Sequence, residues 1–199
     1  MIVRRLTLCL LPVVALSACT TEGTSTGSPL PQFDSYADYD SFGQSLANAS
    51  ASLGFTDPST LPTSGSATYD GVLGLVFEPG TTAESSAIGT MQMNVLFGEN
   101  DITGNVTDFI DDSNRAYQGT LTINNGDIDR GADVEFEFTY FADLGGQLTG
   151  PSGTMTIDAI MAGDLLGPGT YTEGVLSGFS TDNQGTSPIE GGYIGERRE

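Results

Sequence analysis

The sequence predicts an all-β fold: an eight-stranded antiparallel soluble β-barrel that is preceded by one short amphipathic helix. From residue 67 onward, apolar and polar residues alternate in eight short segments, and turn-forming Gly, Asn, Asp and Pro separate these segments. Before them, apolar residues recur at intervals of three and four, as on one face of a helix. The 199 residues suffice for a single domain with one real core.

Residues 1–18 have the layout of a secretory signal, because two arginines precede an apolar run that is too short to span a membrane stably. The run ends in Leu16-Ser17-Ala18-Cys19, which resembles the lipobox of bacterial lipoproteins. That resemblance implies cleavage before Cys19 and acylation of Cys19, and more than one acyl chain makes membrane attachment durable. The other cysteine, Cys9, lies in the segment that would be removed, so no disulfide is expected.

Residues 19–32 follow as a flexible tether from the lipidated cysteine, since they are rich in Thr, Ser, Gly and Pro. Its mean span is about 20 Å. The residue after the cysteine is Thr20 and not aspartate, which favours the outer membrane in the enterobacterial sorting pattern. The sequence leaves open whether the protein faces the cell surface or the periplasm.

The charge balance excludes several functions. The formal net charge is −20, and loss of the two arginines of the signal makes it two units more negative. Such a chain repels nucleic acid and anionic headgroups, so no nucleic-acid partner is expected. Solubility in salty surroundings and attraction to a basic partner both explain the acidity.

The chain also lacks histidine and lysine. It therefore has no Ser-His-Asp or Cys-His arrangement, no imidazole metal site, no phosphate-binding Gly-Lys-Ser/Thr loop and no Schiff base. We expect a protein that is not an enzyme and that holds no cofactor and no metal.

Residues 33–60 are predicted as a helical segment. The apolar residues on one face are Phe42, Leu46, Ala49 and Leu53. Asp40 or Ser41 is expected to cap the start of the helix, and Gly54 is expected to end it. The helix is expected to lie on the domain, and a partner-binding helix is the alternative.

The barrel itself is assigned to residues 61–199. The eight expected strands cover residues 67–77, 90–97, 102–110, 117–123, 134–140, 154–161, 169–179 and 188–196. The fifth alternates most regularly, with Val134, Phe136, Phe138 and Tyr140 opposed to Glu135, Glu137 and Thr139. Turn signals stand at residues 98–100, 111–114, 125–126, 145–146 and 167–169.

Glycine distinguishes a barrel from a sandwich. The glycines inside strand patterns are Gly71, Gly74, Gly104, Gly119, Gly174, Gly178, Gly191 and Gly192. Glycine normally weakens a sheet, whereas the sharp curling of a closing sheet needs it, so a barrel is favoured. The apolar strand faces carry bulky Phe, Met, Leu and Tyr, which suit the filled interior of a small soluble barrel better than a membrane-facing wall.

Three stretches within residues 61–198 resemble transferrin-binding protein B-like lipoproteins. They are residues 61–71, which resemble the entry into the barrel of that family, Val95-Leu96-Phe97-Gly98 with residues 102–106, and residues 174–179 with Gly191-Gly192-Tyr193-Ile194-Gly195. The resemblance implies an eight-stranded barrel on a lipid anchor, in proteins that capture host iron carriers, haem proteins or complement regulators. This chain has one barrel and no room for handle domains, so it resembles the small solute-binding-like relatives and transferrin binding is not implied.

Three places in the sequence are candidate sites. Glu135 and Glu137 would stand roughly 7 Å apart on one strand face, a separation that a carboxylate-pair hydrolase can use, although a wet barrel exterior explains them better. The acidic residues of turns offer calcium ligands without matching a closed calcium motif, namely Asp108, Asp111, Asp112, Asn124, Asp127 and Asp129. Loops at residues 79–87 and 181–187 lack aromatic or arginine anchors, so no binding residue is named there.

These observations lead to one functional hypothesis and one alternative. The first is a non-enzymatic, lipid-anchored envelope lipoprotein whose barrel loops bind a protein or a small solute. The alternative is a periplasm-facing structural or assembly lipoprotein of the outer membrane. In both, Cys19 is the one residue with an assigned role, as the lipidation site, and the membrane is a partner through the lipid anchor.

Overall fold

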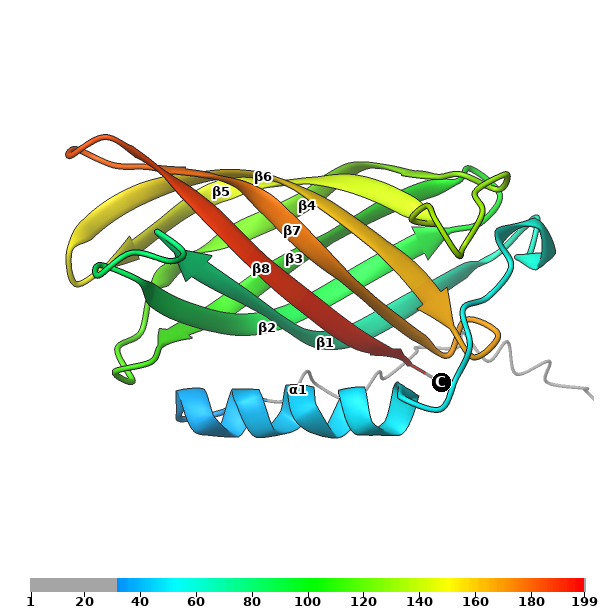
Figure 1. Ribbon diagram of the computed structural model, residues 1–199, viewed down its shortest axis with the longest axis horizontal. Coiled ribbons are helices and arrows are strands. Elements are labelled where there is room, and N and C mark those ends of the chain that lie inside the picture. The colour runs from blue at the N-terminus through cyan, green and yellow to red at the C-terminus, as the bar shows by residue number, and fades with distance from the viewer. Residues whose placement is uncertain (1–31, 199) are drawn as a thin grey trace, which may run out of the picture.

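The computed structural model describes residues 32–198, and eight antiparallel strands in it form a closed barrel (Figure 1). Each strand pairs with its neighbours in sequence, and β8 pairs with β1 to close the cylinder. The strands are β1 Ser66–Phe77, β2 Ser85–Leu96, β3 Asp101–Asp111, β4 Gln118–Ile128, β5 Tyr140–Gly150, β6 Gly153–Leu166, β7 Tyr171–Thr181 and β8 Thr186–Arg197. This confirms the predicted eight-stranded antiparallel barrel with a helix before it. The predicted signal, Cys19 and all but the last residue of the tether lie outside the described residues.

The inward faces of the strands are mainly apolar. The largest fully buried side chains are Tyr39, on the barrel-facing side of the helix, and, inside the barrel, Tyr69, Leu73, Leu75, Met91, Met93, Ile102, Phe109, Leu121, Ile123, Tyr140 and Leu144. An eight-stranded barrel encloses a space just wide enough for side chains to fill. The bulky apolar residues therefore occupy the interior, as expected.

One helix, α1 Tyr36–Ser50, lies along the outside of the barrel against β1, β2 and β8 (Figure 1). Tyr39 and Leu46 are its buried apolar residues, and they pack with outward-facing Val72 and Ile194 in a second apolar cluster. Among the described residues, no helix is long and apolar enough to cross a membrane.

The predicted bounds of this helix were wrong, and its predicted buried face was right only in part. Neither Asp40 nor Ser41 caps it, because Ser35 does: its Oγ accepts a hydrogen bond from Asp38 N (3.2 Å) and donates one to the Asp38 carboxylate (2.6 Å). The helix ends at Ser50, short of Gly54. The buried face contains Leu46, as predicted, together with Tyr39 and Ser50, whereas Ala49 is exposed and Phe42 and Leu53 are only partly buried. The Tyr39 hydroxyl accepts a hydrogen bond from Thr90 on β2, which orients this face toward the barrel.

The predicted fifth strand at residues 134–140 was also wrong. β5 begins at Tyr140, and residues 129–139 form the connection before it. The expected turns at residues 125–126 and 145–146 lie inside β4 and β5. Asn125 has a φ of 50° and lies where the β4–β5 register shifts, so this turn-like sequence makes a β-bulge.

Glycine is required at several points where strands approach closely, and Gly71 shows this most strongly. A Cβ at Gly71 would lie 1.9 Å from the Ile194 carbonyl oxygen and 2.5 Å from the Cα of Gly195, both on β8. Gly74, three residues later on β1, faces outward, and the nearest atom to a Cβ there would be 3.9 Å away. The two positions therefore differ in the space for a methyl group.

Three interior tyrosines satisfy their hydroxyls within the barrel. Tyr193 donates to the Tyr140 hydroxyl (2.9 Å), which also shares a hydrogen bond with Thr172 Oγ1, and Tyr69 donates to the Gly169 carbonyl (2.8 Å). Burial raises the pKa of Tyr69 to about 12, and it raises the pKa of Tyr140 and of Tyr193 well above the ordinary tyrosine value. The interior holds these groups in their neutral form.

We predict that Gly71→Ala destabilises the barrel and that Gly74→Ala does not. A methyl group at Gly71 must displace β8 backbone, which costs about 1–3 kcal/mol or more, whereas Gly74→Ala should stay within about 1 kcal/mol of the parent. Urea unfolding of both variants measures the difference. Equal free energies of unfolding for the two variants would show that the close contact at Gly71 does not constrain closure.

We also predict steep loss of stability at alkaline pH. The folded-state pKa values lie above the unfolded value of about 10, so the stabilisation is complete below about pH 10 and is lost as pH rises toward the folded values. With three such groups, the free energy of unfolding falls by up to about 4 kcal/mol per pH unit in this range. Tyr193→Phe keeps the ring and removes one titrating group, so this slope should fall by about a third in urea unfolding at stepped pH. An unchanged slope would show that Tyr193 does not contribute to the loss of stability at alkaline pH.

Candidate binding surface on the outer wall

Among residues 32–198, seven large apolar side chains are exposed, and they gather on one side of the barrel. They are Phe55, Phe136, Phe138, Phe141, Ile160, Val175 and Phe179, here called the apolar stripe. Their exposed fractions run from 37% at Phe138 to 83% at Phe136. Four come from β5, β6 and β7, and three come from the segments before β1 and β5.

Strand register makes the wall part of the stripe continuous. Phe141 on β5 pairs with Ala162 on β6, which pairs with Val175 on β7, so the three lie side by side on the outer face. Ile160 is the next outward residue along β6, opposite Ser177. Phe179 extends the stripe along β7.

The segment at residues 129–139, which precedes β5, supplies Phe136 and Phe138. A hydrogen bond from Asp129 N to the Thr139 carbonyl (2.9 Å) joins the two ends of this segment. Within it, the Asp133 carbonyl accepts from Phe136 N (2.8 Å) and Glu137 N (2.7 Å), which forms a helical turn. The turn leaves Phe136 in solvent, where a strand would have directed it inward.

Asp164 on β6 anchors the end of this segment. Its Oδ1 accepts hydrogen bonds from the backbone N (2.9 Å) and the Oγ1 (2.8 Å) of Thr139, and both residues are buried. Phe138 is thereby held beside Phe141, with ring centroids 6.2 Å apart in an edge-to-face arrangement. The aromatic part of the stripe is therefore fixed in place by a buried carboxylate.

Phe55 joins the stripe from the linker between α1 and β1. Phe55 forms an isolated β-bridge with Leu166, and Thr56 N donates to the Leu165 carbonyl (2.7 Å). Phe55, Phe136 and Phe138 line one hollow of about 260 Å³. Residues about 80 positions apart in the chain thus form one aromatic surface.

A groove separates the stripe from α1. It has a volume of about 520 Å³, and Gly74 and Gly192, which pair on neighbouring strands, lie on its floor. Asp40 and Ala47 of α1 line one side, and Val175 lines the other. A second hollow, of about 490 Å³, lies at the far end of the stripe around Ile160, Phe179, Pro188 and Glu190.

Acidic residues border the stripe. Asp143 pairs with Ile160, Asp158 pairs with Phe179, and Glu173 and Glu190 line the groove and the second hollow. The described residues contain four arginines and no lysine, and none of the four arginines lies on β5, β6 or β7. The surface therefore has an apolar centre and an anionic border.

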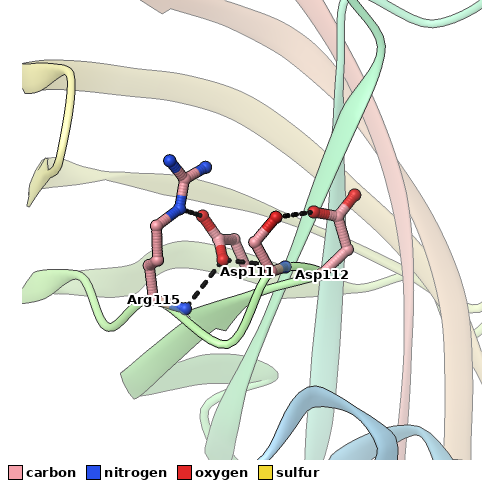
Figure 2. A network of polar contacts seen from close by, with 4 residues as sticks. Asp111, Asp112 and Arg115 are labelled. Atoms are coloured by element: carbon pink, nitrogen blue, oxygen red, sulfur yellow. Dashed lines mark hydrogen bonds and ion pairs between the residues drawn. The ribbon is translucent and has the colours of Figure 1, made fainter.

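Three of these arginines make structural contacts elsewhere. Arg198 forms an ion pair with Asp70. Arg130 turns toward the linker and donates to the carbonyl oxygens of Leu61 (3.0 Å), Pro62 (2.7 Å) and Phe97 (2.7 Å). Arg115 contacts Asp111, whose carboxylate also accepts from the backbone N of Ser113 and of Arg115 (Figure 2).

Two of the acidic residues considered as calcium ligands, Asp111 and Asp129, accept hydrogen bonds from backbone N–H groups of their own turns. Asp111 caps the turn after β3 in the way that Figure 2 shows, and Asp129 Oδ1 accepts from Gly131 N (2.8 Å). Asp108 has a φ of 55° and lies in the region of β3 where the register with β2 shifts. Within the described part of the chain, no three His, Cys, Asp or Glu side chains are grouped as ligands for a metal ion.

The predicted carboxylate pair does not share a strand face. Glu135 and Glu137 belong to the helical turn of residues 129–139, where a Glu137 carboxylate oxygen accepts from Asp133 N (3.1 Å). The alternation of Glu with Val and Phe was a misleading signal, because Asp133 starts a turn through its carbonyl and its carboxylate.

The two loops singled out from the sequence lie at the barrel end opposite residues 129–139. They are shorter than expected and comprise residues 78–84 and 182–185, which contain no large apolar residue. Both are closed by their own hydrogen bonds, as from Gly80 N to the Glu84 carboxylate (2.6 Å). The sequence does not predict the apolar stripe, because the alternation at residues 134–140 indicates a strand with Phe136 and Phe138 on one face.

No family model, no curated protein and no solved structure matches this chain. The resemblance to transferrin-binding protein B-like lipoproteins therefore stays a prediction from the residues that carry it.

Proposed function

We propose that this protein is a non-enzymatic, lipid-anchored binding protein of the bacterial outer membrane, and that it holds a protein partner on the apolar stripe. The observation that carries this proposal is the stripe itself. Large apolar side chains scattered singly over a surface need no explanation, but contiguous apolar patches mark interaction sites. Seven such residues lie on one side of a barrel whose interior is already filled, and we infer that a partner covers them.

The filled interior favours a protein over a small solute as the ligand. Tyr69, Tyr140 and Met91 are among the fully buried side chains that occupy the space where a larger barrel would hold a small molecule. The stripe instead offers an open, elongated surface with shallow hollows, which suits the side chains of another protein.

The anchor is proposed from the sequence. The lipobox-like end of the signal points to acylation of Cys19, and the resemblance to single-barrel, solute-binding-like relatives of transferrin-binding protein B supports a barrel that is tethered to the outer membrane. The absence of histidine and lysine from the sequence supports a non-enzymatic role. A periplasm-facing assembly lipoprotein would use the same stripe. The two functions therefore differ in the side of the outer membrane on which the barrel lies.

We predict that Cys19→Ser releases the protein from the membrane fraction. Without the thiol no acyl chain is added, and the acidic barrel has no attraction to anionic headgroups. Fractionation and intact-mass measurement of the parent and the variant test this. Cleavage of the parent by protease added to intact cells indicates surface display, whereas protection indicates the periplasmic alternative. A parent chain without acyl mass would contradict the anchor.

We also predict that a photo-crosslinking residue at Ile160 captures a partner in living cells and that one at Asn105 does not. Ile160 lies in the stripe, whereas Asn105 faces outward on β3, away from it. Immunoblotting should show a discrete higher-mass adduct for position 160 alone. Equal adducts at both positions, or none at position 160, would contradict a partner on the stripe.

A further inference from the structure

We propose that the segment bound by the apolar stripe is basic and amphipathic, with aromatic or aliphatic anchors flanked by lysine or arginine. This inference rests on the proposed function and adds the chemistry of the partner. It follows from three features of the wall: the charges around the stripe, the groove beside it, and the way in which α1 occupies the neighbouring wall.

The charged residues that line the groove and the two hollows of the stripe are all acidic. Asp158 and Glu190 lie at its Phe179 end, Glu173 lies in the groove, and Glu135 lies beside the aromatic hollow. A lysine or arginine within a few ångströms of these carboxylates gains Coulomb energy, most of all where the apolar contact excludes water. An approaching basic segment is also attracted from a distance by the net charge of the barrel.

The same charges disfavour a second copy of this chain and an anionic lipid surface. A second copy of this chain would bring an identical acidic border against the first, so its association would be opposed by repulsion. An anionic lipid surface would be repelled in the same way. A basic amphipathic partner satisfies the apolar centre and the anionic border together.

Helix α1 shows how the wall holds an amphipathic segment. Its Tyr39 and Leu46 pack on outward-facing Val72 and Ile194, directly beside the groove. Gly74 and Gly192 on the floor of the groove leave space above the strands. A second amphipathic segment can therefore lie between α1 and Val175, with its anchors on the stripe and with Asp40 of α1 adding to the negative border.

The test uses the chain with Cys19→Ser and two synthetic peptides. One is an amphipathic helical peptide with Leu and Phe on one face and Lys on the other, and its twin carries Glu in place of every Lys. Fluorescence anisotropy at about 0.01 M and about 0.15 M salt measures binding. We expect the basic peptide to bind at least about tenfold more tightly than its twin at low salt, and salt to weaken it.

Matched variants locate the binding. Phe141→Ser with Val175→Ser removes anchors of the stripe and should lower affinity about tenfold or more, while exposed positions of this kind leave the fold intact. Asp158→Asn with Glu190→Gln should lower affinity about tenfold at low salt. Asp108→Asn with Asp112→Asn changes the net charge equally on the opposite side of the barrel, and should cost less than about threefold.

Four outcomes of the peptide-binding and sedimentation measurements would overturn the inference. They are absence of binding by the basic peptide, equal binding of both peptides, equal effects of the two double charge variants, and self-association that strengthens with salt in sedimentation velocity. Binding to vesicles of anionic phospholipid that is lost in the stripe variant would equally overturn it. A crosslink at Ile160 to a partner surface without lysine or arginine would leave the proposed function standing and would reject the basic partner alone.

Discussion

The pairing of β8 with β1 is the interaction on which the rest of this structure depends, because it turns a curved sheet into a cylinder with no free edge. The closure brings the two backbones so near that Gly71 and Gly191 have no room for a side chain. It also places Gly74 beside Gly192 on the outside, where no side chain fills the surface. The seam that closes the barrel is thus also the floor of the groove beside the stripe.

Closure divides the residues into an inside and an outside, and the interior is already full. Apolar residues that point outward must then be covered by something else. On β1, β2 and β8 the cover is α1, whose Tyr39 and Leu46 bury Val72 and Ile194. On β5, β6 and β7 no described segment covers Phe141, Ile160, Val175 and Phe179. The uncovered wall carries acidic residues at its border, and this combination of features supports a basic protein partner.

Seven of the eight strands could be predicted from alternation, because their inward residues are apolar and their turns contain Gly, Asn or Asp. The fifth could not, since residues 134–140 alternate perfectly although all but Tyr140 belong to the connection before β5. The turn in this connection is stabilised at its start by hydrogen bonds to Asp133. The helix was found from its apolar spacing, but its start depended on Ser35 and its buried face on a hydrogen bond from Thr90 to Tyr39. The stripe was not predicted, because alternation does not reveal which outward positions share one side of a cylinder.

The sequence by itself determined the strand periodicity, the glycine content, the acidity and the lipobox-like start, since each of these is a property of residue order or composition. Only the tertiary structure decided which apolar residues stay in solvent. Phe55, Phe138 and Val175 come from distant parts of the chain, and strand register, the Asp164–Thr139 hydrogen bonds and the linker bridge at Leu166 bring them together. An apolar surface of this kind is a property of barrel closure, because the residues that form it become neighbours only when the cylinder is complete.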